Sequence, residues 1–293
     1  MKISLKQALR SGRVIIGDGG MGTELQKAGL EPGGCGDEWN LIHPERVLAI
    51  QRAYVEAGSQ LLITNNFGSN RFVLARYELE DKVAALCRAG TKIARQAIGD
   101  GGWVLGDVGP CGGFLEPLGD ITEEQLAESL RVQIGSLLEE SVDGIIFETI
   151  TALEELRVGI RVARELDAPC IIASLAYDKV RDGYKTMMGV APEQAARVAL
   201  EAGADVLGAN CGTGIAPAEF VEIAKRYRAV SDAPIMLQPN AGQPQLEGTA
   251  VVYPVSPREI APMLVELAQY AAVVGACCGS SPAHIGAFRR LLD

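Results

Sequence analysis

The stretch 122-TEEQLAESLRVQIGSLLEESVDGIIFETI-150 places a helix pattern directly before a strand pattern. Thr122 and Gln125 stand at the spacing of a capping box, which predicts a helix from this point to about residue 140. The apolar run 144-GIIFETI-150 predicts a strand, and such a run is typical of a strand that is covered on both faces in a parallel sheet. The stretch therefore predicts an α/β fold.

The same alternation continues along the chain. Ser256, Pro257 and Glu259 fit the N-cap, the first helical position and the capping box of another helix, which is expected to end near residue 270. Eight strand patterns with helices between them, and no Pro/Gly/Ser linker or block of charge, predict one (β/α)8 TIM barrel that spans residues 1–293 as a single domain. The seven other runs are 13-RVIIGDGG-20, 61-LLITNNFG-68, 103-WVLGDVGP-110, 170-CIIASLAY-177, 205-DVLGANCG-212, 235-IMLQPNAG-242 and 271-AAVVGACCG-279.

The segment 29-GLEPGGCGDEWNLIHPE-45 departs from this pattern. It predicts a long loop over the barrel mouth, which joins the first strand to a helix around residues 45–58. In this fold the chemistry takes place at the C-terminal ends of the strands, so the polar residues that close each run are the candidate site residues.

Composition excludes several classes of protein. The formal net charge is −10 and the Lys and Arg residues are not clustered, which argues against a nucleic-acid partner. No apolar run approaches the roughly 20 residues needed to span a membrane, and the short amphipathic start resembles no export signal, so we expect a cytoplasmic protein. Seven cysteines are an odd number and cannot all pair within the chain, which argues against a disulfide framework.

Three cysteines close strand patterns. Cys211 ends the sixth run, and Cys277 and Cys278 end the eighth, so the barrel brings all three to one rim. Adjacent residues of a regular strand point to opposite faces, so the pair can share one ion only where the strand has ended, and Gly279 supplies the freedom to turn. Three thiolates with an open fourth position describe a catalytic zinc site. The alternatives are a vicinal disulfide or small buried side chains.

The metal chemistry suggests a reaction. A zinc ion held by three thiolates activates water poorly but suits a fourth, substrate thiol, which it keeps deprotonated and nucleophilic. This favours thiol alkylation. The four other cysteines have no matching partner and are interpreted as small hydrophobic residues: Cys35, Cys87, Cys111 and Cys170.

The first run contains 17-GDGGMG-22, which matches G-x-G-x-x-G, with Asp37 downstream as a possible ribose contact. The match is weak, because residues 23–34 do not lead into a second strand within about 30 residues, as a dinucleotide fingerprint requires. The alternative is that Asp18 accepts hydrogen bonds from a ligand ammonium while neighbouring backbone N–H groups bind a carboxylate.

Two further polar residues close strand patterns. Glu148 ends the fourth run, where it is either a ligand contact or a solvated rim carboxylate. Asn240 follows the seventh run and can simply cap a turn. We expect the two histidines, His43 and His284, to have ordinary structural roles.

Together these motifs resemble the homocysteine S-methyltransferase family over nearly the whole chain, and most closely the homocysteine-binding barrel of cobalamin-dependent methionine synthase. The motifs that carry the resemblance are 18-DGGMGTELQ-26, 38-EWNLIHPERV-47, 64-TNNFGSNR-71, 210-NCG-212, 239-PNAGQP-244 and 275-GACCGSSPAHI-285.

The resemblance implies a set of roles. Zinc would be bound by the three strand-end cysteines, with the homocysteine sulfur as fourth ligand and methionine as product. Asn240 would match an asparagine that can occupy the fourth zinc position before substrate arrives. The implied residues are Cys211, Cys277 and Cys278 for the metal, Asp18 and Glu148 for the ammonium group, and the backbone near Gly19 and Gly20 for the carboxylate.

The resemblance also points to a methyl donor. It implies a methylated corrinoid, such as methylcobalamin, yet 286-GAFRRLLD-293 stands where the eighth helix should finish, and Leu41 and Pro282 stand where an Asp-x-His-x-x-Gly corrinoid signature needs aspartate. We therefore expect the corrinoid on a separate partner protein. Gly68 after Phe67, in place of the tyrosine of the betaine-using branch, argues against betaine.

Three alternatives remain open at this stage. S-methylmethionine is the alternative methyl donor. The Gly-rich turn leaves a nicotinamide-dependent oxidoreductase as a second hypothesis. A zinc or redox-sensing protein without catalysis is the third.

Overall fold

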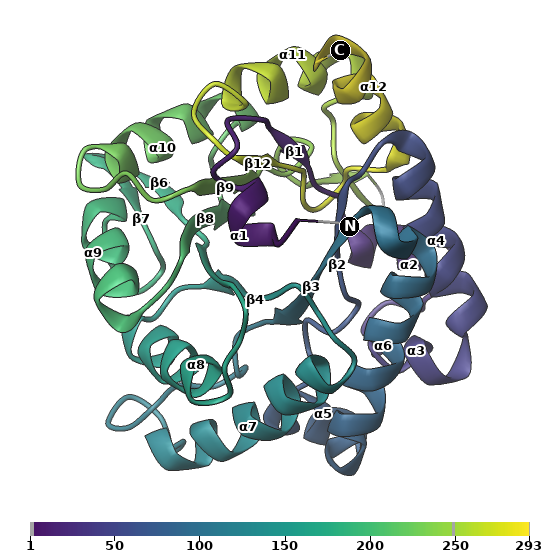
Figure 1. Cartoon of the computed structure of the whole chain (residues 1–293), viewed down its shortest axis with the longest axis vertical. Coiled ribbons are helices and arrows are strands. Elements are labelled where there is room, and N and C mark those ends of the chain that lie inside the picture. The colour runs from purple at the N-terminus through teal and green to yellow at the C-terminus, as the bar shows by residue number, and fades with distance from the viewer. Residues whose placement is uncertain (1–2, 248–249, 293) are drawn as a thin grey trace.

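The computed structural model describes residues 3–247 and 250–292. Its centre is an eight-stranded parallel sheet in the order β1-β12-β9-β8-β5-β4-β3-β2. The two outer strands meet, because the Gln60 N–H donates to the Ile16 carbonyl at 2.7 Å, and the sheet forms a nearly closed barrel (Figure 1). The strands are β1 Ile15–Ile16, β2 Leu61–Ile63, β3 Trp103–Val108, β4 Gly144–Ile150, β5 Ile171–Leu175, β8 Val206–Asn210, β9 Ile235–Gln238 and β12 Val273–Val274.

Each of the eight predicted runs contains one of these strands, so the prediction of a (β/α)8 barrel is confirmed. Strand β4 fills its whole run. The seven other strands are shorter than their runs, because the last residues of those runs have left the sheet and form the loops of the C-terminal rim.

Helices surround the sheet, as Figure 1 shows. Between the helices lie four short 3-10 turns, at Ala75–Tyr77, Glu80–Lys82, Gly99–Gly101 and Pro217–Glu219. The α-helices are α1 Leu5–Ala8, α2 Met21–Lys27, α3 Trp39–Ile42, α4 Pro44–Ala57, α5 Arg71–Leu74, α6 Val83–Ile98, α7 Glu123–Glu139, α8 Leu153–Glu165, α9 Pro192–Ala202, α10 Phe220–Arg228, α11 Pro257–Leu267 and α12 Pro282–Leu292.

The predicted helix starts are confirmed. At α7 the Gln125 N–H donates to the Thr122 hydroxyl at 3.2 Å, and the Thr122 N–H donates to the Gln125 side chain at 2.9 Å. At α11 the Glu259 carboxylate accepts a hydrogen bond from the Ser256 N–H at 2.8 Å. These bonds satisfy backbone donors that a helix leaves unpaired at its N-terminus.

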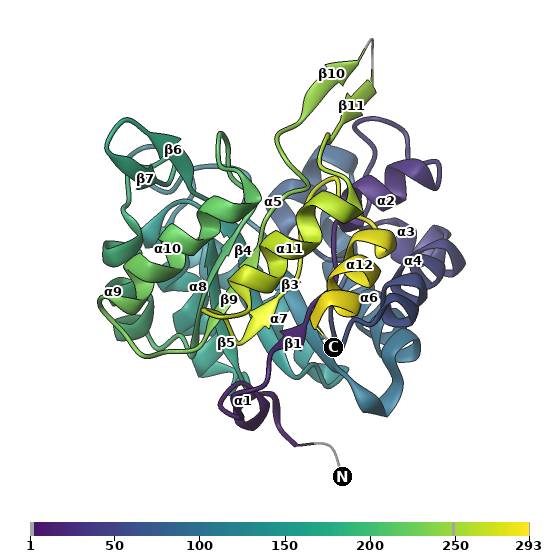
Figure 2. The same cartoon turned by 90° about the horizontal axis from the view of Figure 1, so that it is seen from above.

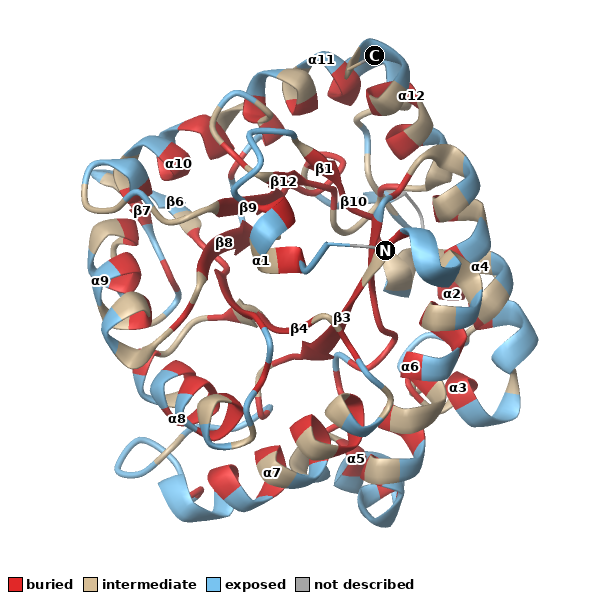
Figure 3. Cartoon of the chain, in the orientation of Figure 1, coloured by how far each residue is buried: buried red, intermediate tan, exposed pale blue. Residues whose placement is uncertain are grey.

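The core has two layers, visible in Figure 3 as buried strands inside a ring of helices that are buried on their inner faces. One cluster fills the barrel interior and includes Leu105 and Ile146, and the larger cluster lies between strands and helices. Helix α1 closes the N-terminal end of the barrel, because Leu5 and Leu9 join the interior cluster (Figures 1 and 2). This plug leaves the C-terminal end for ligands.

The prediction of a long loop over residues 29–45 was wrong in part. Trp39–Ile42 form α3, which packs against α4 and α6, and α4 already begins at Pro44. Trp39 is buried in a small cluster with Leu25 and Val47, and this contact stabilises a helical turn that local sequence does not predict. The segment lies against the end of β2, where the Asn40 amide donates to the Asn65 carbonyl at 2.7 Å.

Two antiparallel hairpins were not predicted. They are β6 Asp178–Val180 with β7 Gly183–Lys185, and β10 Gln245–Glu247 with β11 Ala250–Val252. The second hairpin projects from the end of the barrel opposite α1 (Figure 2). Among the described residues, no helix is both long enough and apolar enough to cross a membrane.

Candidate metal centre and substrate site

The structure brings Cys211, Cys277 and Cys278 together at the C-terminal end of the barrel. Their sulfur atoms all lie within 4.8 Å of one another, and the Cys277 and Cys278 sulfurs are 3.9 Å apart. Two sulfurs bound to one tetrahedral zinc ion at ~2.3 Å are ~3.8 Å apart, so the spacing fits a shared ion. Within residues 3–247 and 250–292, no other group of His, Cys, Asp and Glu has this geometry.

The backbone at these cysteines has left the strand conformation. Cys211 has φ +57° and Gly279 has φ +78°, both in the left-handed region. The prediction that Gly279 allows the turn after the cysteine pair is confirmed. A left-handed conformation is unfavourable for a residue with a side chain, and at Cys211 it is held by the N–H bond to the Gln238 carbonyl at 3.2 Å.

The protonation of the three thiols is shared. Hydrogen bonds from the Cys277 and Cys278 thiols lower the pKa of Cys211, and the same bonds to Cys211 raise the pKa values of Cys277 and Cys278. One thiolate is thus stabilised by two protonated neighbours. A bound metal ion replaces such protons, because cysteine binds metal as the thiolate.

Asn240 lies beside the cluster. Its amide N–H donates to the Cys211 sulfur at 3.6 Å. Its side-chain oxygen is buried and has no hydrogen-bond partner in the part of the chain that the structure describes. Asn240 therefore offers an unpaired oxygen near the three sulfurs.

The remaining cysteines lie elsewhere. Cys87, Cys111 and Cys170 are buried in the hydrophobic clusters, and Cys35 is half-buried against the largest one. This confirms their interpretation as hydrophobic residues. All seven cysteines are free, so the cysteine pair is not a vicinal disulfide.

Two carboxyl groups lie close to the cysteine cluster. Asp18 follows β1, is 3% exposed, and accepts the Ile63 N–H at 2.8 Å. Burial raises the pKa of Asp18 to about 7. Burial also raises the pKa of Glu148 to about 8, and the negative charges of Asp18 and Cys211 add to this effect. A ligand cation at this position would relieve the repulsion among these groups.

The position of Glu148 is supported by a contact that links the end of β4 to the end of β8, next to Cys211. The Asn210 amide donates to the Thr149 hydroxyl at 2.7 Å, and the Thr149 N–H donates back to the Asn210 side-chain oxygen at 3.0 Å. Thr149 has φ +59°, and the register of β4 against β5 shifts between Phe147 and Ile150. Sequence analysis gave Asn210 and Thr149 no role, although Asn210 directly precedes Cys211.

Gly19 and Gly20 allow a close approach between two loops. A side chain on Gly19 would lie 2.5 Å from the Ser280 hydroxyl, and one on Gly20 would lie 2.8 Å from the Cys277 carbonyl. The Gly20 N–H donates to the Ser280 hydroxyl at 3.0 Å, and that hydroxyl donates to the Cys277 carbonyl at 2.7 Å. The loop after β1 is therefore fixed to the loop after β12, which carries Cys277 and Cys278.

These contacts do not favour a dinucleotide site. The Asp37 carboxylate accepts hydrogen bonds from the Gly68 N–H at 3.0 Å and the Ser69 hydroxyl at 2.6 Å, so it is engaged by the loop after β2. Gly19 and Gly20 of the Gly-rich turn serve loop packing in this structure.

Both histidines lie outside the cysteine cluster. His284 bonds to the Ser281 hydroxyl at 2.9 Å and to the Val255 carbonyl at 3.0 Å, and burial lowers its pKa. His43 packs edge-on against the Trp39 ring. These contacts agree with the interpretation of both histidines as structural residues.

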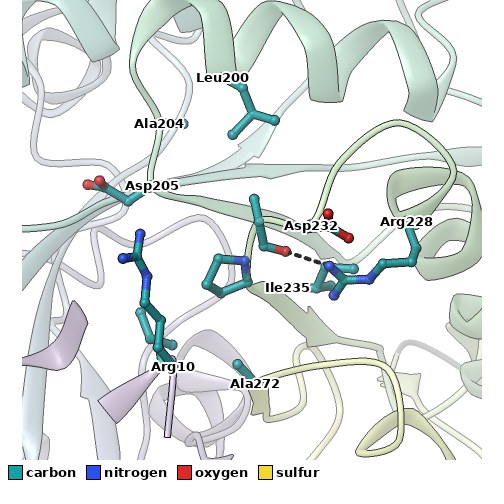
Figure 4. A pocket seen from close by; sticks show the side chains of 11 residues that line it. Arg10, Leu200, Ala204, Asp205, Arg228, Asp232, Ile235 and Ala272 are labelled. Atoms are coloured by element: carbon teal, nitrogen blue, oxygen red, sulfur yellow. Dashed lines mark hydrogen bonds between the residues drawn. The ribbon is translucent and has the colours of Figure 1, made fainter. Parts of the chain in front are cut away.

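Two cavities flank the barrel. One of about 810 Å³ lies at the C-terminal ends of β3 and β4, lined among others by Thr149, Phe114 and Met187. The other, of about 660 Å³, lies at the N-terminal end of the barrel, where Arg10 and Arg228 face it (Figure 4). The first cavity is lined by Thr149, the neighbour of Glu148, but not by the three cysteines, Asp18 or Glu148 themselves.

The raised pKa of Glu148 leads to a prediction for the zinc-free protein. The folded state favours the protonated form of the Glu148 carboxyl. Its contribution to the free energy of unfolding is therefore complete below the ordinary pKa of 4.5 and is lost as pH rises towards the folded-state pKa of about 8. Between about pH 5 and pH 8, we expect the wild type to lose on the order of 2 kcal/mol of unfolding free energy relative to Glu148→Gln. Urea unfolding of both proteins measures this, and parallel pH profiles would contradict it.

Known proteins are similar to this chain in sequence. Residues 15–292 match the family described as homocysteine S-methyltransferase. The chain is 33% identical over 293 residues to methionine synthase of Mycobacterium tuberculosis (strain ATCC 25618 / H37Rv), a match that covers 94% of this chain and 24% of that protein. It is 32% identical over 291 residues to methionine synthase of Mycobacterium leprae (strain TN), covering 93% and 24%. The chain thus spans about a quarter of the length of these relatives.

Solved structures share the fold. The metallated form of the homocysteine methyltransferase MmuM from Escherichia coli has a TM-score of 0.79 at 20% identity, over 98% of this chain and 99% of that chain. The carboxyl transferase domain of Rhizobium etli pyruvate carboxylase has a TM-score of 0.52 at 13% identity, over 98% and 47%. The barrel alone is therefore not specific, but the family match runs from the first strand of the barrel to its last helix, and the chain belongs to the homocysteine S-methyltransferase family.

Proposed function

We propose that this chain is a zinc-dependent S-methyltransferase that methylates homocysteine to methionine. The observation that carries the proposal is the cluster of Cys211, Cys277 and Cys278, with zinc-compatible spacing, near the buried carboxyl of Asp18 and the half-buried carboxyl of Glu148. Zinc bound by three thiolates lowers the pKa of a thiol that joins them, so that the thiol is nucleophilic at neutral pH.

The residues around the cluster suit an α-amino acid. Asp18 and Glu148 would accept hydrogen bonds from the substrate ammonium, and the backbone near Gly19 and Gly20 would bind the carboxylate. Asn240 would stay near the fourth metal position until the substrate sulfur takes it. The Asn210 contact with Thr149 would keep Glu148 at a fixed distance from Cys211.

The reaction itself needs little from the protein. The substrate sulfur attacks the methyl carbon, the bond from methyl to donor breaks, and the donor leaves with the electron pair. No proton moves at the sulfur if it is already a thiolate, so neither Asp18 nor Glu148 needs to act as a general base. The protein contributes by positioning the reactants, because holding the thiolate and the methyl donor in line lowers the entropic part of the activation barrier.

For the methyl donor, we propose a methylcorrinoid carried by a separate protein. Two observations support it. Relatives with about one third identity are methionine synthases. Exposed apolar side chains also stand on the loops that line the 810 Å³ cavity: Phe114 is 46% exposed, Leu118 71% and Met187 65%. Such a surface is typical of an interaction site.

A methyl-transfer assay tests the function. Homocysteine is offered with methylcobalamin, a methylated corrinoid protein, S-methylmethionine and betaine in separate reactions, and methionine is measured. We expect methionine from the methylcorrinoids above the rate without protein, and none from betaine. Transfer from S-methylmethionine alone would contradict the proposed donor and leave the metal site in place.

A further inference from the structure

Asp107 is a buried carboxyl in the barrel that the proposed mechanism does not use. It lies on β3, two residues after Leu105, which belongs to the interior cluster, so the alternation of a strand directs its side chain into the barrel. It pairs in register with Ile146, another interior residue, which precedes Glu148 by two positions. Asp107 therefore lies on the same inner face as Glu148, one step deeper.

The Asp107 side chain has an unused acceptor. The residue is 3% exposed, and its Oδ1 atom is buried without a hydrogen-bond partner among the described residues. Burial raises its pKa, and the charged groups that add to this effect are all acidic, with Glu148 first, then Asp37 and Asp18. A buried acceptor without a donor is costly, which indicates that a donor is supplied from outside the chain.

We propose that Asp107 is a third acceptor for the substrate ammonium, together with Asp18 and Glu148. This inference rests on the proposed function. An ammonium group has three N–H donors and no acceptor, and two carboxylates leave one donor unpaired in a buried site. With Asp107 at the bottom of the site, three carboxyl groups surround a primary ammonium group. The site then selects against thiols that have no amino group or whose amino group is acylated.

The test compares two thiols on the zinc-loaded protein. Homocysteine has the ammonium group, and 4-mercaptobutanoate is the same molecule without it. Binding is measured by calorimetry, with zinc content determined for each variant. We expect Asp107→Asn to weaken homocysteine binding about tenfold, the lower range for a hydrogen bond to a charged group, and to leave 4-mercaptobutanoate binding unchanged.

Two further variants sharpen the result. Asp107→Ala removes both oxygens without adding an amide donor, and it should show the same selective loss. Asp37→Asn is the matched control, because it removes a buried negative charge whose carboxylate is engaged by Gly68 and Ser69, and it should leave the preference for homocysteine unchanged.

The outcomes separate the two proposals. Equal weakening of both thiols by the Asp107 variants, or no weakening of homocysteine, would overturn the role of Asp107 while the wild type still binds homocysteine. Wild-type protein that binds neither thiol would overturn the proposed function itself, and the role of Asp107 with it.

Discussion

Replacing Cys277 by alanine should remove bound zinc and methyl transfer together. Only two sulfurs would remain at a site where the three atoms lie within 4.8 Å of one another, and a catalytic zinc site needs three protein ligands. Removing a residue that only hydrogen-bonds to a metal ligand typically weakens metal affinity roughly 10–100-fold. Because Cys277 would itself be a ligand, we expect its loss to weaken zinc affinity by more than that. Elemental analysis gives zinc per chain, and the methionine assay gives activity on the same preparation.

Cys35→Ala is the control for that experiment. Cys35 is free and half-buried, and it lies outside the cluster, so its variant should keep both zinc and activity. Cys211→Ala and Cys278→Ala should behave as Cys277→Ala does. Full zinc occupancy in Cys277→Ala would show that the metal site is assigned to the wrong residues.

Removing the charge of Asp18 or Glu148 should weaken homocysteine binding by about 1.5–3 kcal/mol each, the scale of a hydrogen bond to a charged group. Asp18→Asn keeps an oxygen that can accept the Ile63 N–H, and Glu148→Gln keeps the length of the side chain. Zinc content should stay at the wild-type level, because neither residue belongs to the cysteine cluster. Calorimetric titration with homocysteine measures the change.

Glu155→Gln is the matched control for Glu148→Gln. Glu155 is also a carboxyl whose burial raises its pKa, but its oxygen accepts the Cys111 N–H at 2.6 Å. Its variant should bind homocysteine as the wild type does. Unchanged homocysteine affinity in Asp18→Asn would mean that the ammonium group binds elsewhere.

Much of the fold was predictable from local sequence, because each barrel unit is built from neighbouring residues. The capping box at Thr122 and the apolar run that starts at Gly144 are complete within a few residues, and the structure has α7 and β4 there. Helix α3 was missed because the burial of Trp39 against Val47, rather than local propensity, stabilises it.

The cysteine cluster could also be predicted, for a topological reason. All parallel strands of a barrel end at one rim, so Cys211 and the Cys277–Cys278 pair had to approach one another once eight strand patterns were recognised. The same reasoning placed Asp18 and Glu148 at that rim. Whether these carboxyls bind substrate stays a prediction, and the experiments above test it.

The sequence by itself determined the eight strands of the barrel sheet, the rim on which the polar residues stand and the cysteines that can share an ion, because strand period and chain order fix these features. Only the tertiary structure decided which polar side chains have a hydrogen-bond partner. Asn210 reaches Thr149 across 61 positions, and Asp107 keeps an oxygen inside the barrel that has no partner within residues 3–247 and 250–292. Such pairings depend on side-chain directions and on burial by segments that are distant in the sequence. The same burial raises the pKa of Glu148 to about 8, and the local sequence around Glu148 does not indicate it.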